Sequence, residues 1–402
     1  MKQDKQTQDK NVYRSHYPRC TSIILPVLVF FLPFASYAEE QANRIATDIL
    51  NSPGTSKEET KVIPEDYNFN VESIATETKA NWKKFDFHGF FEVTSPLQGR
   101  DDESQQPSSK FLDENELTLW MGKQITKKLS FDSEVEITKG LKKYDLEKFE
   151  FDYEIMDKFL IGRVGKFKYP LGIERFVEDG PFDKLVDRPL PSIRIIPGTY
   201  SDIGGMFYGT IPLPWDTNIK YEIAVTNGLA GPDPVDVQQL WDNNSNKAIG
   251  GRLGYECLPG LEIGGSYSRQ KYDEDNKLNI NFLGADIQFK RGNLEVRSEY
   301  ITSSVDRKTI DGGVFDRNGY YIQTAYKYPF NLNYVKSVEG VVRFDFLDTH
   351  QYVANGEETN RIAIGMNYFP VEHVEIKFEY EIEDEPAEGS HGKAFVQAIF
   401  RW

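Results

Sequence analysis

Acidic side chains recur at every second position in two neighbouring stretches of the chain, 129–138 and 147–156. Residues two apart lie on the same face of a β-strand, so this spacing aligns the carboxylates along one wall. A wall of carboxylates attracts cations and repels anions. The acidic residues that we predict to face the same side are Glu116, Asp132, Glu134, Glu136, Glu150, Asp152 and Glu154.

Basic side chains occupy the same alternating polar positions in the later part of the chain. On these later strands the basic positions are mixed with acidic ones, among them Glu222, Glu295 and Asp345. The arginines that we predict to share the polar face are Arg252, Arg297, Arg343 and Arg361.

A long segment, about 167–200, is rich in proline and in charges of both signs. Long ordered loops are usually functional. If the surrounding strands enclose a channel, this segment is the best candidate for a loop that folds inward and constricts it. The alternative is a loop that lies outside the channel. The side chains that we predict at the constriction are Lys166, Lys168, Glu174 and Arg175.

Catalytic groups are scarce in this sequence. Beyond residue 38 the histidines are His88, His350, His373 and His391. Ser390 precedes His391 in sequence, but a catalytic triad is defined by spatial geometry and not by sequence proximity. The loops rich in Asp and Asn lack the spaced ligands of a calcium loop. We therefore predict no catalytic residue, no metal site and no cofactor.

Composition narrows the class of protein. The chain has 402 residues, a formal net charge of -16, and 27 Phe, 22 Tyr and 5 Trp. With 39% hydrophobic residues, the chain is too polar to span a membrane as a bundle of helices. It carries too many aromatic residues for a disordered protein. The acidic balance argues against nucleic acid as a partner, because phosphate binding needs a basic surface.

The N-terminus has the pattern of a secretory signal peptide. Basic residues precede an apolar run from Ile23 to Phe34, and small residues follow up to Ala38. The apolar run is too short for a transmembrane helix. We predict cleavage near Ala38, a polar periplasmic extension or linker over residues 39–83, and an outer-membrane barrel over 84–402. The mature chain would keep only Cys257, so it would form no internal disulfide.

From Phe85 onward, apolar and polar residues alternate in segments of about ten residues, the length that crosses a bilayer at a tilt. Short turns alternate with longer polar loops, which is typical of outer-membrane barrels. In the segment 280–289 the alternation slips near Phe282, and we predict a β-bulge there. The sixteen predicted strands begin near residues 85, 114, 128, 147, 158, 202, 217, 247, 260, 278, 293, 317, 338, 359, 372 and 393.

The apolar faces favour a membrane barrel over a soluble β-sandwich. They are rich in Phe and Tyr, as in the aromatic girdles of membrane barrels, whereas a soluble core would be richer in Val, Ile and Leu. The last segment ends on Trp402 and resembles the C-terminal strand that the barrel assembly machinery reads. The predicted fold class is all-β: a transmembrane antiparallel β-barrel of about sixteen strands with an inward-folded constriction loop.

The segment 164–174, VGKFKYPLGIE, resembles the strand-then-loop segment of the phosphate-selective porin O and P family. The resemblance extends over about residues 85–402 and implies a sixteen-stranded, trimeric barrel that conducts small solutes. In that family phosphate selectivity is linked to an arginine ladder and a basic constriction. Further similar segments are 221–228, 248–255, 294–300, 319–326, 339–345 and 361–370. The matching positions are Arg297, Arg343 and Arg361 for the ladder, and Lys168 and Arg175 for the constriction.

The leading functional prediction is an outer-membrane porin through which small hydrophilic solutes or ions diffuse passively, without chemistry. One alternative is a porin selective for anions or phosphate. Another is a barrel with a structural, adhesive or enzymatic role. The predicted partners are the lipid bilayer and lipopolysaccharide, the barrel assembly machinery, and further copies of the chain in a homotrimer.

Overall fold

The computed structural model describes residues 85–98, 115–138, 142–177, 179–197, 200–234, 241–307, 313–332, 334–349, 358–386 and 389–402. All of them belong to one compact unit, Asn68–Trp402. The predicted signal peptide, 1–38, and the predicted extension, 39–83, lie outside the described residues. No helix in the described part of the chain is long and apolar enough to cross a membrane.

Sixteen β-strands account for most of the described residues. They are β1 (Asp86–Gln98), β2 (Asn115–Gln124), β3 (Leu129–Thr138), β4 (Lys143–Met156), β5 (Leu160–Lys168), β6 (Ser201–Leu213), β7 (Thr217–Thr226), β8 (Ala248–Leu258), β9 (Leu261–Lys271), β10 (Asn279–Arg291), β11 (Leu294–Asp306), β12 (Val314–Leu332), β13 (Val335–Asp348), β14 (Glu358–Val371), β15 (Val374–Glu385) and β16 (Gly389–Arg401).

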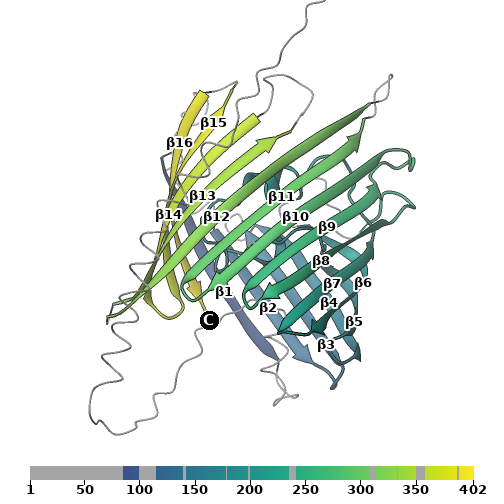
Figure 1. Cartoon of the computed structure of the whole chain (residues 1–402), viewed down its shortest axis with the longest axis horizontal. Coiled ribbons are helices and arrows are strands. Elements are labelled where there is room, and N and C mark those ends of the chain that lie inside the picture. The colour runs from purple at the N-terminus through teal and green to yellow at the C-terminus, as the bar shows by residue number, and fades with distance from the viewer. Residues whose placement is uncertain are drawn as a thin grey trace, which may run out of the picture. The chain divides into compact units, whose positions relative to one another are not determined.

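The strands form a closed antiparallel barrel in which each strand pairs with its neighbours in sequence and β1 pairs with β16 (Figure 1). At this closure the backbones of Gly89 and Trp402 exchange hydrogen bonds of 3.1 and 3.3 Å. The predicted fold class is thereby confirmed. The largest differences from the predicted strand starts are at β4, expected from 147 and observed from Lys143, and at β16, expected from 393 and observed from Gly389.

The two ends of the barrel differ in their connections. One end has tight turns such as Pro259–Gly260, where Gly260 adopts a φ of +83° that favours glycine. The other end has long connections, including 169–200 and 227–247. In outer-membrane barrels the short turns face the periplasm and the long loops face outward, and we name the two ends accordingly.

The two faces of the sheet differ as the alternation predicts. On β8, Ile249 and Leu253 are more than half exposed on the outer surface, whereas Arg252 between them projects inward and is buried. On β11, Tyr300 is exposed on the outer surface and Glu299 is buried inside. The outer face is therefore apolar and the inner face is polar and charged, which suits lipid outside and water inside.

Part of the barrel interior is apolar, which the sequence pattern did not reveal. Ile280 and Phe282 of β10 point inward and pack in a buried cluster with Phe167, Tyr169 and Leu171. The strand pairs regularly with β9 and β11 from Ile280 onward, without a register shift. The predicted bulge near Phe282 is therefore wrong. The alternation slips because inward positions become apolar where they contact the segment that follows β5.

Candidate functional site: the loop inside the barrel

The connection between β5 and β6, which we call the inner loop (residues 169–200), folds into the barrel. It contains a short 3-10 helix, η3 (Glu174–Phe176), and one turn of helix, α3 (Leu190–Arg194). Pro191 lies in the first turn of α3, where the missing N–H costs no hydrogen bond. Gly172 has a φ of +72°, and a Cβ there would lie 1.9 Å from Glu299 Oε1 on the wall. The backbone can approach β11 this closely only with glycine.

The first part of the inner loop is bound to the wall formed by β7 to β12. The Gly172 N–H donates to Ser266 Oγ over 3.2 Å, and the Ile173 N–H donates to Glu299 Oε1 over 3.1 Å. The Tyr321 hydroxyl donates to the Glu174 carboxylate, and Arg175 forms an ion pair with Glu222 of β7.

The middle of the inner loop is bound to β14 and β15. Lys377 Nζ donates to the carbonyl oxygens of Gly180, Asp183 and Leu185 at 2.6, 2.9 and 3.4 Å. The Asn367 amide donates to the Lys184 carbonyl over 2.9 Å. Backbone groups that would otherwise be unpaired in the lumen are satisfied by side chains of the wall.

The same part of the loop reaches the barrel closure. Phe182 contacts Trp120 of β2, with ring centroids 6.0 Å apart, and packs beside Phe90 and Ile399. Gly180 approaches β1 so closely that a Cβ would lie 1.8 Å from Glu92 Oε2. The inner loop therefore contacts β1 and β2 as well as β7 to β15. It crosses the lumen and narrows the space inside the barrel.

The four predicted wall arginines all face inward, but each of them contacts carboxylates. Arg252 forms a two-pronged contact with Asp286 at 2.9 and 2.5 Å. Arg297 lies 3.4 Å from Glu295, and 3.9 Å from both Glu174 and Asp183 of the inner loop.

Arg343 and Arg361 share one carboxylate. The Nε atoms of these arginines lie 3.1 and 2.8 Å from the same oxygen of Asp345. Arg343 also donates to the carbonyl oxygen of Asp187 over 2.8 Å, and Arg361 lies 3.5 Å from the Asp187 carboxylate. Both guanidiniums are at most 1% exposed. The inner loop covers these arginines, which bind it to the wall.

The early acidic wall is partly neutralised. Lys148 lies 2.7 Å from Asp132, and Lys168 lies 3.3 Å from Glu134. Arg163 of β5 pairs with Glu150 at 3.1 Å and with Asp152 at 2.7 Å. Sequence reasoning missed Arg163 because the strand 160–168 is glycine-rich and its alternation is weak. The signal that could have identified Arg163 is the position of its strand, next to the acidic strand β4.

Three further carboxylates lie on the neighbouring strands β1, β2 and β3. Glu92 lies directly opposite Glu116 in the register, and Glu136 lies on the adjacent strand β3. All three are partly exposed, and no ion pair to any of them is formed by the residues that the structure describes. Glu154 is also partly exposed, near the periplasmic turn that ends β4.

The predicted constriction residues lie in two places. Lys166 donates to the Leu146 carbonyl of β4 over 2.5 Å, and so lies on the wall. Lys168 joins Glu134 to Asp179 of the inner loop, the latter at 3.5 Å. Glu174 and Arg175 lie within the inner loop.

Burial changes the acidity of these two loop groups. It raises the pKa of the Glu174 carboxyl, and the nearby Arg297 guanidinium opposes this rise. Burial lowers the pKa of the Arg175 guanidinium, and Glu222 opposes this fall.

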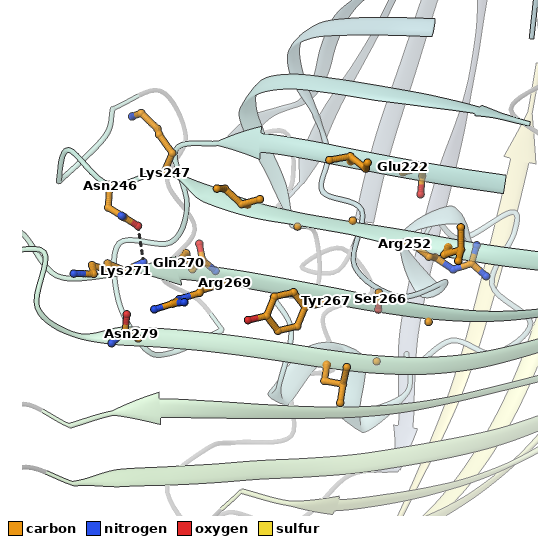
Figure 2. Close-up of a pocket in the computed structure, with 18 residues that line it drawn as sticks. Glu222, Asn246, Lys247, Arg252, Ser266, Tyr267, Arg269, Gln270, Lys271 and Asn279 are labelled. Carbon is orange, nitrogen blue, oxygen red and sulfur yellow. Dashed lines mark hydrogen bonds between the residues drawn. The ribbon is translucent and has the colours of Figure 1, made fainter. Parts of the chain in front are cut away.

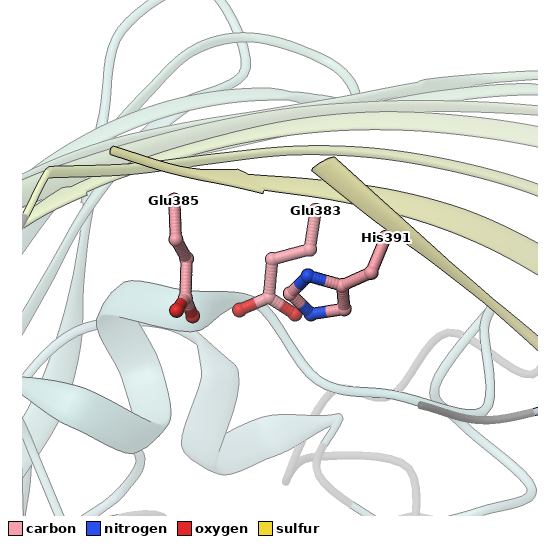
Figure 3. Close-up of side chains that lie close together, drawn as sticks. All are labelled: Glu383, Glu385 and His391. Atoms are coloured by element: carbon pink, nitrogen blue, oxygen red, sulfur yellow. The ribbon is translucent and has the colours of Figure 1, made fainter. Parts of the chain in front are cut away.

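One group of side chains has the composition of a cation site. Glu383, Glu385 and His391 lie at the extracellular end of β15 and β16 and approach one another on the inner side (Figure 3). One ligand atom from each falls within 4.8 Å of the others. Lys393 Nζ already lies 2.9 Å from Glu383 Oε2 and 3.1 Å from Glu381, so a bound cation would have to displace an ammonium group.

This chain is similar in sequence to one known protein and similar in structure to several solved outer-membrane proteins. An uncharacterized protein of Aquifex aeolicus is 28% identical over 319 residues, which are 69% of this chain and 71% of the relative. The anion-selective porin from Comamonas acidovorans has a similar structure, with a TM-score of 0.55 and 13% identity over 79% of this chain and 99% of that one.

Two more solved structures share the fold, each over 79% of this chain and at 10% identity with a TM-score of 0.51. They are the trimer form of OmpT, an outer-membrane protein of Vibrio cholerae, matched over 99% of its chain, and the outer-membrane channel DcaP of Acinetobacter baumannii, matched over 97%. At such low identities these likenesses establish the barrel fold.

Residues 216–393 match the family model described as phosphate-selective porin O and P. The match runs from the turn before β7 into β16 and includes Arg252, Arg297, Arg343 and Arg361. The resemblance to this family that the sequence indicates is thereby borne out over residues 216–393, the part of the chain that the family model matches.

Proposed function

We propose that this protein is an outer-membrane porin through which small hydrophilic solutes and ions diffuse passively. The observation that carries the proposal is the inner loop, which crosses the lumen of a closed sixteen-strand barrel and is bound to charged side chains on opposite walls. A barrel of this size leaves an aqueous channel, and a loop folded inside it sets the width of the passage. The family match supports the same conclusion.

We further propose that the channel prefers cations. The inward arginines contact carboxylates, whereas Glu92, Glu116 and Glu136 form no ion pair within the described residues. These carboxylates lie on adjacent strands beside the tip of the inner loop. Their joint field raises the local concentration of cations and penalises anions.

The test is the reversal potential of single channels in a planar bilayer at pH 9, where the three carboxylates are ionised, under a gradient of potassium chloride. The wild-type channel should give a potential that indicates cation preference. The variant Glu116→Gln with Glu136→Gln should shift this potential toward zero, because two of the three unpaired carboxylates lose their charge. Anion preference in the wild type would contradict the cation proposal and leave the porin proposal intact. Absence of channel activity would contradict both.

A matched control removes two carboxylates that do not face the lumen. Asp384→Asn with Glu372→Gln changes the net charge equally, at exposed positions on the outer face of β15 and in a periplasmic turn. Its reversal potential should equal that of the wild type.

Selectivity for phosphate or other anions is the second candidate, and the family description favours it. The solved porin from Comamonas acidovorans, which shares the fold, is described as anion-selective. In this chain an anion would compete with Asp345, Asp286 and Glu295 for the arginines. Millimolar phosphate should block chloride current if this candidate is correct, and should leave the current unchanged if the channel prefers cations.

We propose a cellular setting from the sequence and the fold. The signal peptide would be cleaved near Ala38 on export, and the barrel assembly machinery would insert the chain beside lipopolysaccharide in the outer membrane. We also propose a homotrimer, since OmpT of Vibrio cholerae, which shares the fold, has a trimer form. Chemical cross-linking in outer-membrane vesicles tests this assembly by the mass of the linked product.

A further inference from the structure

The outer surface of the barrel has a hollow over β8, β9 and β10 (Figure 2). Its volume is about 910 Å³. Gly251 and Gly265 are outward positions that lack a side chain, and the exposed side chains of Ile249, Leu253 and Leu283 surround them. The hollow is therefore apolar and lies on the face that lipid tails cover.

The extracellular end of the hollow is basic. Lys247, Arg269 and Lys271 line it there, close to the long connections 227–247 and 272–278. Lys247 pairs with Asp242, and Lys271 Nζ donates to the Asn276 carbonyl over 2.6 Å. Arg269 is exposed and forms no ion pair with any residue that the structure describes.

Along the hollow, apolar side chains are followed by basic ones, which matches the order of acyl chains and phosphates in a lipid. Acyl chains lie at the level of the apolar strand surface, and phosphates lie at the level of the membrane boundary. A guanidinium binds a phosphate with two parallel hydrogen bonds. Arg269 lies on the same outward face as Tyr267, whose ring lies farther from the extracellular end of the hollow and whose position suits the interface.

We propose that this hollow is a binding site for a phosphate-bearing lipid of the outer leaflet, with an acyl chain over Gly251 and Gly265 and a phosphate at Arg269. The site lies outside the channel. It rests on the outer-membrane location in the proposed function, and it is independent of the solute that the channel conducts.

Two variants test the two ends of the site. Gly265→Phe fills the hollow, and the position accepts a side chain because a Cβ would meet only the Gly284 carbonyl oxygen at 3.6 Å. Arg269→Gln removes the cation and keeps a polar side chain.

Each variant has a matched control on the same outer face. Gly205→Phe adds a ring on β6, where a Cβ would lie 3.7 Å from the Arg163 carbonyl oxygen and away from the hollow. Arg291→Gln removes an exposed cation at the periplasmic end of β10. Circular dichroism verifies the β-sheet content of all four variants.

Native mass spectrometry of the full chain in detergent, titrated with bisphosphorylated lipid A, measures binding directly. We expect one saturable site per chain in the wild type, about tenfold weaker binding in Gly265→Phe and in Arg269→Gln, and unchanged binding in both controls. Lipid A from which the phosphates have been removed should bind like the Arg269→Gln variant.

Three results would overturn the proposal. Wild-type affinity in both test variants would mean that lipid binds elsewhere. Equal affinity for the dephosphorylated lipid would remove the role of Arg269. A smaller oligomer in Gly265→Phe, with lipid binding unchanged, would mean that a second copy of the chain covers the hollow. Because the readout is binding, a failure here is distinct from a failure of channel activity.

Discussion

Asp345 is the residue on which the arginines of the wall depend. Its carboxylate is fully buried and lies within 3.1 Å of the Nε atoms of both Arg343 and Arg361. Two guanidiniums this close together repel each other unless an anion lies between them. Asp345 therefore holds Arg343 and Arg361 in place and also neutralises part of their positive charge.

Replacing Asp345 with Asn should destabilise the barrel by about 3 kcal/mol, because a buried charge loses its partner. The midpoint of urea unfolding, followed by circular dichroism, measures this change. Asp384→Asn on β15 is the control, since Asp384 is exposed and its substitution should leave the midpoint unchanged. Equal midpoints for the two variants would contradict the structural role of Asp345.

For single residues, the sequence predicts which face of the barrel a side chain points to better than it predicts which residues that side chain contacts. Strict alternation places Glu150, Arg252 and Arg361 on the inner face, where the structure has them. It does not predict that Arg361 shares Asp345 with Arg343, because that contact depends on the register of β13 against β14. Nor does it predict that the inner loop covers both arginines.

At the scale of structural elements, Lys377 fixes the inner loop to the wall of the barrel. Its ammonium group donates to three loop carbonyls, so one side chain of β15 holds the segment 180–185 in place. Among its described residues the loop has only two short helical turns of its own. Its conformation is therefore set by the wall rather than by local secondary structure.

Lys377→Met should release the segment 180–185 while the strands stay paired. Hydrogen–deuterium exchange should increase at least tenfold in this segment, because hydrogen bonds to a charged donor stabilise by about 1.5–3 kcal/mol each. Lys327→Met is the matched control, because Lys327 lies over the Phe369 ring and is bound to no residue of the loop among those described. Equal exchange in both variants would show that Lys377 does not hold the loop.

A second prediction concerns the backbone of the loop. Gly172→Ala adds a Cβ at a positive φ and against Glu299, so the first part of the loop should leave its place on β11. Single-channel recordings should then show a conductance that differs from the wild type and fluctuates more. Gly340→Ala is the control, since nothing lies within 4 Å of a Cβ there. A wild-type trace from Gly172→Ala would contradict this role.

Proline and mixed charge were enough to single out the segment 167–200, but not to predict where it binds. Its partners include Asn367, Lys377 and Glu379, which follow nearly two hundred residues later. Such contacts have no local sequence signal. The apolar packing between the loop and β10 was misread as a bulge for the same reason.

The molecule as a whole was the most predictable level. Each strand pairs with the next along the chain, so recognising sixteen alternating segments was nearly equivalent to knowing the topology. The one long-range pairing, β1 with β16, follows from closure, which removes the exposed strand edges.

Closure yields a prediction for Trp402. Deleting this residue removes both backbone hydrogen bonds to Gly89 and the indole ring of Trp402. The amount of folded protein in isolated outer membranes should fall several-fold, as measured by quantitative immunoblotting. Trp241→Ala is the control, because Trp241 is 85% exposed in a connection between strands. Equal amounts for the two variants would argue against a role for Trp402 in assembly.

The position of Lys377 in the chain also sets an order of events during folding. Lys377 lies 197 residues beyond Gly180, to whose carbonyl oxygen it donates. Contacts with such large sequence separation form late, because the entropy of closing a long loop must be overcome first. The passage should therefore be wide while the strands are being added, and should reach its final width only when the last hairpin closes the barrel.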